Sequence, residues 1–267
     1  MDARTRRDRI ERRIRTDLEV GYSELAAEFD VSEMTIRRDV EALETQGVVR
    51  RVVGGAISTK GLSGPDTEPS FATRVADAAV EKRHIADVVA DLIGRNETVI
   101  LDSGSTALAV AQSLKGRGLG LTVVTPSVLA ALTLVDEPDT TVVLTGGQLR
   151  PGELSLIGPT TEDTLGHYNC DTFVMGVAGI DAGRGISDYH QAESRVKHAA
   201  SKRADRVVVA ADKSKLGRVT FVTIAALSDV DLIVTDGEPD HPSLVAARTA
   251  GVDVVCVAGD AERAETL

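Results

Sequence analysis

Aromatic residues are scarce: there is no tryptophan, and only 3% of the side chains are aromatic, although 42% of the 267 residues are hydrophobic. The core must therefore consist of Val, Ile, Leu and Ala, a composition typical of parallel strands that helices cover on both faces. Long apolar runs are missing as well. The longest, such as residues 207–211, are strand-sized and far shorter than the ~20 residues of a membrane-spanning helix.

Cysteine is also scarce, since only Cys170 and Cys256 occur, and neither lies in a Cys-x-x-Cys spacing or beside a histidine. This arrangement favours buried thiols over the alternative of a metal or redox site, so we expect neither a metal ion nor a cofactor. Residues 1–4 lead into a charged segment rather than an apolar signal peptide. We therefore expect a cytoplasmic protein with no membrane partner.

Negative charge predominates, with a net charge of −11 at pH 7, but its distribution is uneven. Residues 1–60 contain twelve basic and twelve acidic residues, so the whole acidic excess lies in residues 61–267. Eleven of the twelve N-terminal cations are arginine, the residue preferred for contacts with phosphates and base edges. A solvated, charged helix explains them equally well, so charge alone leaves a nucleic-acid partner open.

One segment divides the chain. Residues 59–70 contain two prolines and two glycines and show no apolar periodicity. We interpret this segment as a linker between a small domain, residues 1–58, and a larger domain, residues 71–267. The small domain has a helical pattern, because apolar residues recur every four positions from Ile10 onward.

The larger domain alternates short apolar runs with helical patterns. The runs cover residues 98–101, 121–125, 141–145, 172–177, 206–211, 232–235 and 252–257. The helical patterns cover residues 85–93, 106–114, 127–134, 191–203 and 242–250. This alternation predicts an α/β effector domain with a largely parallel sheet flanked by helices.

Residues 23–47 of the small domain are predicted to form two helices around a tight turn. Ser23 would cap the first helix and Ser32 the second, each by accepting a backbone N–H. The second helix carries an apolar stripe formed by Ile36, Val40 and Leu43. At about 100° per residue, Arg38 lies almost opposite this stripe, with Thr35 and Arg37 on its flanks. Such a helix suits the DNA major groove, but a helical hairpin with solvated arginines fits the periodicity equally well.

The order of specific residues in this domain favours the DNA-binding helix, and we call residues 1–58 the DNA reader. The positions concerned are Val31, Ser32, Thr35, Ile36, Arg37, Arg38, Asp39, Leu43, Glu44, Gly47, Arg50, Gly54, Gly55 and Ala56. In this order they closely resemble the winged helix-turn-helix of the DeoR family of bacterial regulators. The resemblance implies a recognition helix and a wing over residues 50–57. It implies operator contacts from Ser32, Thr35, Arg37, Arg38 and Arg50, and none from Val53, where the family usually has histidine.

In the larger domain, the run at 98–101 leads into Asp102, Ser103, Gly104, Ser105 and Thr106, which open a helix. Gly104 allows close backbone approach, and the hydroxyls and the helix N-terminus supply donors, as in phosphate sites. A simple helix cap is the alternative. Gly146 and Gly147 form a second close-approach loop at the same predicted sheet edge, where open α/β sheets bind ligands.

Three charged residues are predicted at this edge: Asp181, Glu193 and Lys215. Taken singly, Asp181 fits an acidic residue in a turn, and Glu193 fits one half of a helical i,i+4 pair with Lys197. Lys215 fits a solvated surface lysine. With the two loops they form the series Asp-Ser-Gly-x-Thr, Gly-Gly, Gly-Ile-Asp, Glu-x-x-x-Lys and Asp-x-Ser-Lys. This series resembles the DeoR-family effector domain, which is similar in fold to ribose-5-phosphate isomerase and the glucosamine-6-phosphate deaminases.

The resemblance implies that residues 103–106 hold a phosphate while Asp181, Glu193 and Lys215 face the sugar. Two positions depart from the family pattern: Pro126 stands where Asn is usual and Ser194 where Ala is usual. Pro126 removes a side-chain donor and a backbone N–H beside the expected ligand.

Together these features predict a DNA-binding transcriptional regulator, a repressor of a sugar-metabolism operon that a small phosphorylated sugar releases from double-stranded operator DNA. A homo-oligomer would contact repeated or palindromic half-sites. Two alternatives stay open. One is a sugar-phosphate isomerase- or deaminase-like enzyme, in which the three charged residues transfer protons; the other is an architectural DNA-binding protein with a vestigial domain. The N-terminal reader argues against the enzyme.

Overall fold

The computed structural model describes residues 3–17, 19–45, 49–52, 54–58 and 68–257. The chain forms two compact units, Met1–Thr73 and Arg74–Leu267. Most of the expected linker, residues 59–67, lies outside the described residues, so the predicted boundaries at 58 and 71 stay a prediction. Within the described residues, no helix has both the length and the apolar character needed to cross a membrane.

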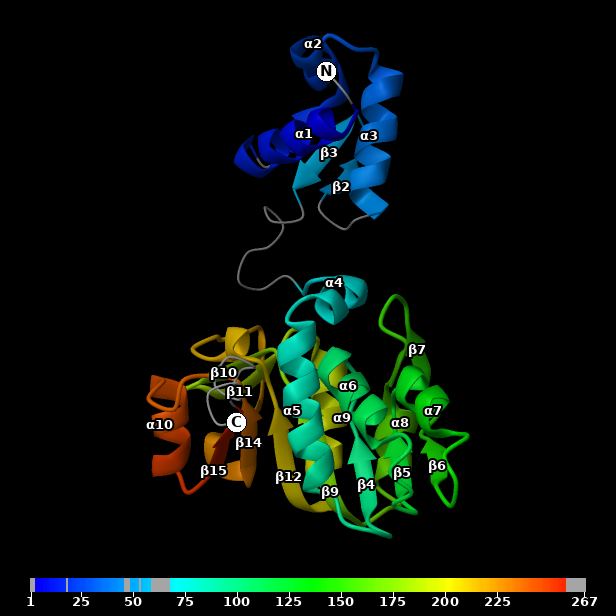
Figure 1. Ribbon diagram of the computed structural model, residues 1–267, viewed down its shortest axis with the longest axis vertical. Helices are drawn as coiled ribbons and strands as arrows, with labels where there is room; N and C mark the ends of the chain where they lie inside the picture. The colour runs from blue at the N-terminus through cyan, green and yellow to red at the C-terminus, as the bar shows by residue number, and fades with distance from the viewer. Residues whose placement is uncertain (1–2, 18, 46–48, 53, 59–67, 258–267) are drawn as a thin grey trace, which may run out of the picture. The chain divides into compact units, whose positions relative to one another are not determined.

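The N-terminal unit is a winged helix-turn-helix (Figure 1). Its elements are α1 (Ala3–Asp17), β1 (Glu19–Gly21), α2 (Tyr22–Phe29), α3 (Glu33–Thr45), β2 (Val49–Val52) and β3 (Gly55–Ser58). The strands form an antiparallel sheet in the order β1-β3-β2, in which β2 and β3 are the two arms of the wing. Strand β1 was not predicted, because three residues are too few to show an alternating pattern.

The core of this unit joins all three helices. Ile10, Ile14, Leu25, Ile36 and Val40 are completely buried, which confirms the predicted inward faces. Burial of each such side chain stabilises the fold by roughly 1.5–3 kcal/mol.

The turn between α2 and α3 forms where it was predicted. Asp30 adopts a left-handed conformation, with φ of 51°, and ends α2. The cap predicted for α2 is wrong. The residue before α2 is Gly21, no side chain caps the helix, and Ser23 lies within its first turn.

The C-terminal unit is built on a seven-stranded parallel sheet, in the order β15-β14-β12-β9-β4-β5-β6. Its strands are β4 (Thr98–Leu101), β5 (Thr122–Thr125), β6 (Thr141–Leu144), β9 (Cys170–Gly176), β12 (Ala204–Ala210), β14 (Leu232–Thr235) and β15 (Asp253–Cys256). Each of the seven predicted runs is one of these strands, and the predicted fold class is confirmed.

Helices cover both faces of the sheet (Figure 1). They are α5 (Ala79–Asp91), α6 (Ser105–Leu114), α7 (Val128–Leu134), α8 (Pro159–Leu165), α9 (Gln191–Ser201) and α10 (Pro242–Thr249). Side chains alternate along the strands, so Val99 and Leu101 pack in the core under α5–α7, while Ile100 packs in the core under α8–α10. A short helix, α4 (Phe71–Ala76), precedes α5, and the 3₁₀ turns η1 (Lys213–Lys215) and η2 (Leu227–Asp229) flank β13.

Two small antiparallel sheets were not predicted. One is the hairpin of β7 (Gln148–Arg150) and β8 (Ser155–Ile157). The other joins β10 (Gly179–Asp181), β11 (Gly185–Asp188) and β13 (Val222–Ala225). Arg150 and Ser155 of the hairpin contact Glu193 of α9, and Asp188 of β11 contacts Lys197 of the same helix.

The strand order reverses between β4 and β9. From β4 the chain proceeds outward to β5 and β6, and it then returns to the other side of β4 and proceeds outward again from β9 to β15. The carboxyl ends of the two strands at such a reversal border a crevice that binds ligands in open α/β folds. The predicted phosphate loop, Asp102–Thr106, follows β4 and therefore lies at this crevice.

Candidate functional site

Helix α3 of the N-terminal unit presents a polar face to solvent. Ile36, Val40 and Leu43 are buried, whereas Arg37 and Arg38 are exposed. The predicted division of this helix into a packed and an outer face is therefore confirmed. Met34, which was not predicted, is 62% exposed on the first turn of the same helix.

The start of α3 is fixed by its own hydroxyl groups. The Thr35 amide donates to Ser32 Oγ at 3.3 Å, and the two side-chain oxygens lie 3.0 Å apart. Ser32 thus caps α3 as predicted. Ser32 is exposed and Thr35 is half-buried, so both hydroxyls lie beside the outer face.

Arg37 is partly fixed by an aromatic ring, because its guanidinium lies 4.9 Å from the centroid of Tyr22 on α2. Asp39 fixes the opposite side of the helix. This buried carboxylate accepts from Arg6 Nε at 2.6 Å and so joins α3 to α1. Arg50 lies on β2, with its backbone paired to Ile57. Its side chain, like Val53 of the wing turn and Gly47 after α3, lies outside the described residues.

In the C-terminal unit, the loop after β4 begins a helix that has no side-chain cap. Gly104 is the N-cap of α6, with φ of 107°, a conformation that favours glycine. Ser103 and Ser105 are half-buried and Thr106 is buried, and within the described chain their hydroxyls make no hydrogen bond. The first N–H groups of any helix also lack intrahelical partners. The loop therefore offers an unfilled set of donors.

Asp102 has a different environment from the rest of the loop. Its side chain is 2% exposed, and its Oδ2 accepts from the Gly176 amide at 3.0 Å and from Lys197 Nζ. Burial raises the pKa of Asp102, and Lys197 opposes that shift. Asp102 therefore fixes the position of the loop between β4 and β9, the two strands at the reversal.

Lys197 is the centre of a buried charge cluster that was not predicted. In addition to Asp102, its ammonium donates to the Gly176 carbonyl at 2.7 Å and lies 3.2 Å from Asp188 Oδ2. Burial opposes the charge of Lys197, but Asp102 and Asp188 raise its pKa well above the ordinary value. The lysine is therefore protonated at neutral pH, and it joins α9 to β4, β9 and β11.

Glu193, one turn earlier on α9, is also buried. Its carboxylate accepts from Arg150 Nη1 at 2.8 Å and from Ser155 Oγ at 2.7 Å. Burial alone would raise the pKa of Glu193, but Lys197, Ser155 and Arg150 together lower it below the ordinary value. Glu193 is thus ionised and joins α9 to the β7–β8 hairpin.

The remaining predicted residues lie in neighbouring loops. Gly146 and Gly147 both have positive φ, and Gly147 packs so closely on Thr161 and the Ile157 carbonyl that a side chain would clash. Asp181 accepts from the amides of Gly183 and Arg184, both at 2.9 Å, and so closes the β10–β11 turn.

Lys215 follows β12, and its Nζ lies 3.9 Å from Asp212 Oδ2. Asp212 is 1% exposed, and this oxygen accepts no hydrogen bond from the described residues. The structure thus groups Asp102 and Glu193 around Lys197, and it places Lys215 beside a second buried carboxylate.

Neither cysteine belongs to a cluster. Cys170 is buried, and burial raises the pKa of its thiol, but Cys256 is only half-buried, so the prediction of two buried thiols is wrong for Cys256. The part of the chain that the structure describes contains no group of three or more His, Cys, Asp or Glu residues that could hold a metal ion.

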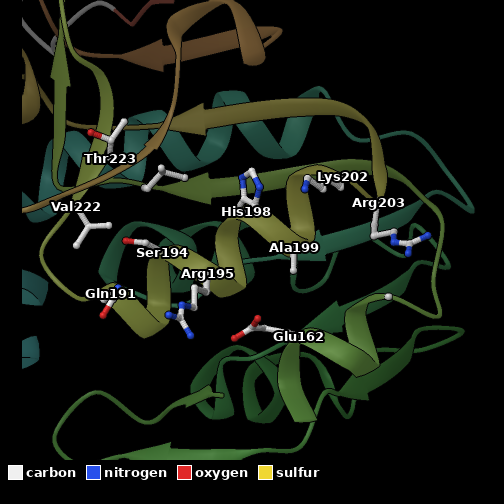
Figure 2. Close-up of a pocket in the computed structure, with 12 residues that line it drawn as sticks. Glu162, Gln191, Ser194, Arg195, His198, Ala199, Lys202, Arg203, Val222 and Thr223 are labelled. Atoms are coloured by element: carbon white, nitrogen blue, oxygen red, sulfur yellow. The ribbon is translucent and has the colours of Figure 1, made fainter. Parts of the chain in front are cut away.

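A separate cavity of about 740 Å³ lies on the other side of α9. Arg195 and His198 line it from α9 and Lys202 from the C-cap of that helix, with Glu162 from α8 and Thr223 from β13 (Figure 2). Glu193 and Lys197 are not among its lining residues, because they occupy the opposite, buried face of the helix. This cavity is therefore distinct from the crevice at the strand reversal.

A winged helix-turn-helix unit, followed in the chain by an α/β unit with a strand-order reversal of the kind that binds ligands, defines a class of protein: a DNA-binding transcriptional regulator with a small-molecule sensor domain. The comparisons with known proteins specify the class further. The DeoR-like helix-turn-helix domain matches residues 6–61, and the DeoR C terminal sensor domain matches residues 77–237. The chain belongs to the DeoR family.

Curated relatives match over most of their length. HTH-type transcriptional regulator GlpR of Haloferax volcanii is 36% identical over 84% of this chain and 86% of its own. The glycerol-3-phosphate regulon repressor of Escherichia coli (strain K12) is 33% identical over 82% and 85%. HTH-type transcriptional repressor GlcR of Bacillus subtilis is 34% identical over 79% and 80%. These relatives are regulators, and this chain is likewise a regulator and not an enzyme.

Among solved structures, ribose 5-phosphate isomerase A from Methanocaldococcus jannaschii is similar at 18% identity and a TM-score of 0.39, over 52% of this chain and 55% of that chain. A TM-score this low does not establish a shared fold. The class of the sensor therefore rests on the family match and on its own sheet topology.

Proposed function

We propose that this regulator represses a sugar-metabolism operon, and that a small phosphorylated sugar bound at the strand reversal lowers its affinity for operator DNA. The observation that carries the proposal is the start of α6, which combines unfilled hydroxyl and backbone donors with a place in the ligand crevice of the sheet. The names of two relatives, a glycerol-3-phosphate regulon repressor and a transcriptional repressor, agree with this function.

In the DNA complex, α3 would enter the major groove. The exposed Arg37 and Arg38 would contact base edges or phosphates, and the stacking of Arg37 on Tyr22 limits the conformations of its guanidinium before binding. Ser32 and Thr35, at the helix start, would hold the DNA backbone. Arg50 would do so from the wing.

In the sensor, the phosphate would accept hydrogen bonds from the α6 N-terminus and from the side chains of Ser103, Ser105 and Thr106. A helix N-terminus suits this group because its N–H dipoles point outward and carry partial positive charge. The Gly146–Gly147 loop lets the backbone approach the ligand closely. Asp181, Glu193 and Lys215 would contact the sugar end.

Binding has to change the reader through a difference in affinity between two states. If the sugar phosphate binds more tightly to the state that fits the operator badly, it lowers the affinity for DNA. The ratio of its affinities for the two states limits the size of that effect. Coupling of this kind is typically about 1–3 kcal/mol. We propose a cytoplasmic homo-oligomer, in which two readers contact repeated or palindromic half-sites.

The test has two steps. First, the full chain selects duplexes from a random pool, which identifies an operator without knowledge of the regulated genes. Second, three- to six-carbon sugar phosphates are titrated into the operator complex, which is followed by fluorescence anisotropy. Release by one phosphate and not by its free sugar supports the proposal. Sequence-independent DNA binding, or an operator complex that responds to no phosphate, contradicts it.

A further inference from the structure

The proposed phosphate loop contains no cation of its own. Its residues are Asp102, Ser103, Gly104, Ser105 and Thr106, so its intrinsic charge is negative rather than positive. Hydrogen bonds to a phosphate are strongest when the donor is charged, and Arg is the best such donor because its planar fork matches two phosphate oxygens. A complete site for a phosphate dianion therefore calls for a cation from another element.

Two nearby cations have other roles in the structure. Lys197 is enclosed by Asp102, Asp188 and the Gly176 carbonyl. Arg150 donates to Glu193. Moving Lys197 to a ligand would leave two buried carboxylates without their cation, which is costly. Arg150 is excluded by its position, because none of its atoms lies within 4 Å of the place that a Cβ would occupy on Gly104.

Arg74 of α4 is placed differently. Its Nη1 lies 4.0 Å from the position that a Cβ would occupy on Gly104. Apart from the chain neighbours of Gly104, no other atom of the described residues lies within about 4 Å of that position. Since Gly104 is the N-cap of α6, this places a guanidinium at the mouth of the proposed phosphate loop. The side chain is 19% exposed, so it is largely withdrawn from bulk water.

A second nitrogen of this guanidinium pairs with a carboxylate of the β7–β8 hairpin. Nη2 of Arg74 donates to Glu153 in the turn of the β7–β8 hairpin, and Glu153 is 10% exposed. Arg74 belongs to α4 and Glu153 follows β7, so this ion pair joins two segments that are distant in sequence. A phosphate at the α6 N-terminus would carry the same charge as the Glu153 carboxylate and would lie within reach of the same guanidinium.

The backbone of α4 is held in place independently. Lys82 of α5 is 4% exposed, and its ammonium donates to the carbonyl of Arg74 and to that of Asp77 at 2.6 Å. These bonds fix the end of α4, so the Arg74 side chain projects from a stationary base. A guanidinium with a fixed base can exchange partners by rotation of its side chain alone.

From this geometry we propose that Arg74 is a further effector-binding residue, whose guanidinium binds the phosphate at the α6 N-terminus in competition with Glu153. The proposal rests on the phosphosugar function and names the cation of that site. It also gives α4 a role, because α4 is the first helix after the expected linker in the sequence. Ligand binding would thus change the side-chain contacts of α4, which is close in sequence to the DNA-binding unit.

The experiment measures the affinity of the full chain for inorganic phosphate by isothermal titration calorimetry, in wild type and two variants. Arg74→Gln should weaken phosphate binding by about tenfold or more, the loss expected for one charge-assisted bond. Glu153→Gln should instead strengthen it, because the competing carboxylate is gone. Arg117→Gln is the matched control, since this arginine pairs with Asp91 on the outer surface, and it should leave the affinity unchanged.

The opposite signs separate binding from a structural role. Both variants remove the same ion pair, so if the pair only stabilised the fold they would shift the unfolding midpoint together and would not move phosphate affinity in opposite directions. Equal phosphate affinity in wild type and Arg74→Gln overturns this inference and leaves the phosphosugar function intact. Absence of phosphate binding in wild type overturns the phosphate site itself, and the inference with it.

Discussion

The buried cluster around Lys197 gives a quantitative prediction for stability. In a Lys197→Met variant the side chain keeps much of its volume, but Asp102 and Asp188 lose their cation while they remain buried. Removing one partner of a buried ion pair costs about 3–5 kcal/mol, because the remaining charge is uncompensated. We expect the free energy of unfolding of the sensor unit to fall by that amount near neutral pH.

The pH dependence distinguishes an unpaired charge from a packing defect. Burial already raises the pKa of Asp102 above its ordinary value of 3.8, and loss of Lys197 removes the opposing effect. A carboxyl whose folded pKa is raised stabilises the fold while it is protonated, and that contribution is lost as pH rises through the folded pKa. The loss in free energy of unfolding of the variant, relative to wild type, should therefore shrink as pH falls toward 3.8.

The measurement is chemical denaturation followed by circular dichroism between acidic and neutral pH, with the transition of the sensor unit analysed separately from that of the reader. Lys202→Met, at the C-cap of the same helix, is the control, because this lysine is exposed and its loss should cost less than about 0.5 kcal/mol. Adding Asp102→Asn to Lys197→Met should recover part of the stability. A deficit below about 1 kcal/mol, or one that does not change with pH, would refute the charge argument.

Three further predictions concern function. Arg37→Ala with Arg38→Ala should weaken operator binding by about 1–3 kcal/mol for each arginine that reads a base edge, measured by anisotropy, and wild-type affinity in a folded double variant would remove α3 from the interface. The effector should need its phosphate, because each charge-assisted bond contributes about 1.5–3 kcal/mol, and equal calorimetric affinity for the free sugar would reduce the α6 loop to a helix start. Lys215→Ala should bind operator within a few-fold of wild type yet no longer release it when effector is added; normal release would exclude Lys215 from the site, and failure to bind DNA without effector would mean a structural role.

The main sheet and its helices could be predicted because their signals are local. A parallel strand buried on both faces is a continuous apolar run, and the strands β4 and β14 have the predicted bounds. The strands of the small sheets carry no such signal. For example, β7 reads Gln-Leu-Arg, and β11 pairs with β13 some forty residues later, as in the register of Ile186 with Ala225.

The charge cluster was missed because an i,i+4 pair of Glu and Lys is usually a surface feature. A signal was present, however. At about 100° per residue, Glu193 and Lys197 lie on the same face of α9 as Val196 and Ala200, and all four are buried. What the periodicity could not supply is the identity of the partners, since Arg150 and Asp102 come from segments that are distant in sequence.

The two departures from the family pattern prove to be accommodated locally. Ser194 is buried, but its hydroxyl donates to the His190 carbonyl at 3.1 Å, one turn earlier on the same helix. Pro126 lacks an N–H, but its carbonyl accepts from the Leu156 amide at 2.8 Å and so holds β8 beside the end of β5. Neither substitution leaves an unsatisfied group in the crevice, because each residue bonds to its own surroundings.

The surroundings of the cluster also argue against proton transfer by its members. A general acid or base works best when its pKa lies near the working pH. The surroundings of Lys197 raise its pKa and those of Glu193 lower its pKa, so both groups move away from neutrality. Their protons and lone pairs are engaged with Asp102 and Asp188 on one side and with Arg150 on the other. Residue types that could transfer a proton beside a carbonyl group here form ion pairs that join α9 to the loop after β4, to β11 and to the β7–β8 hairpin.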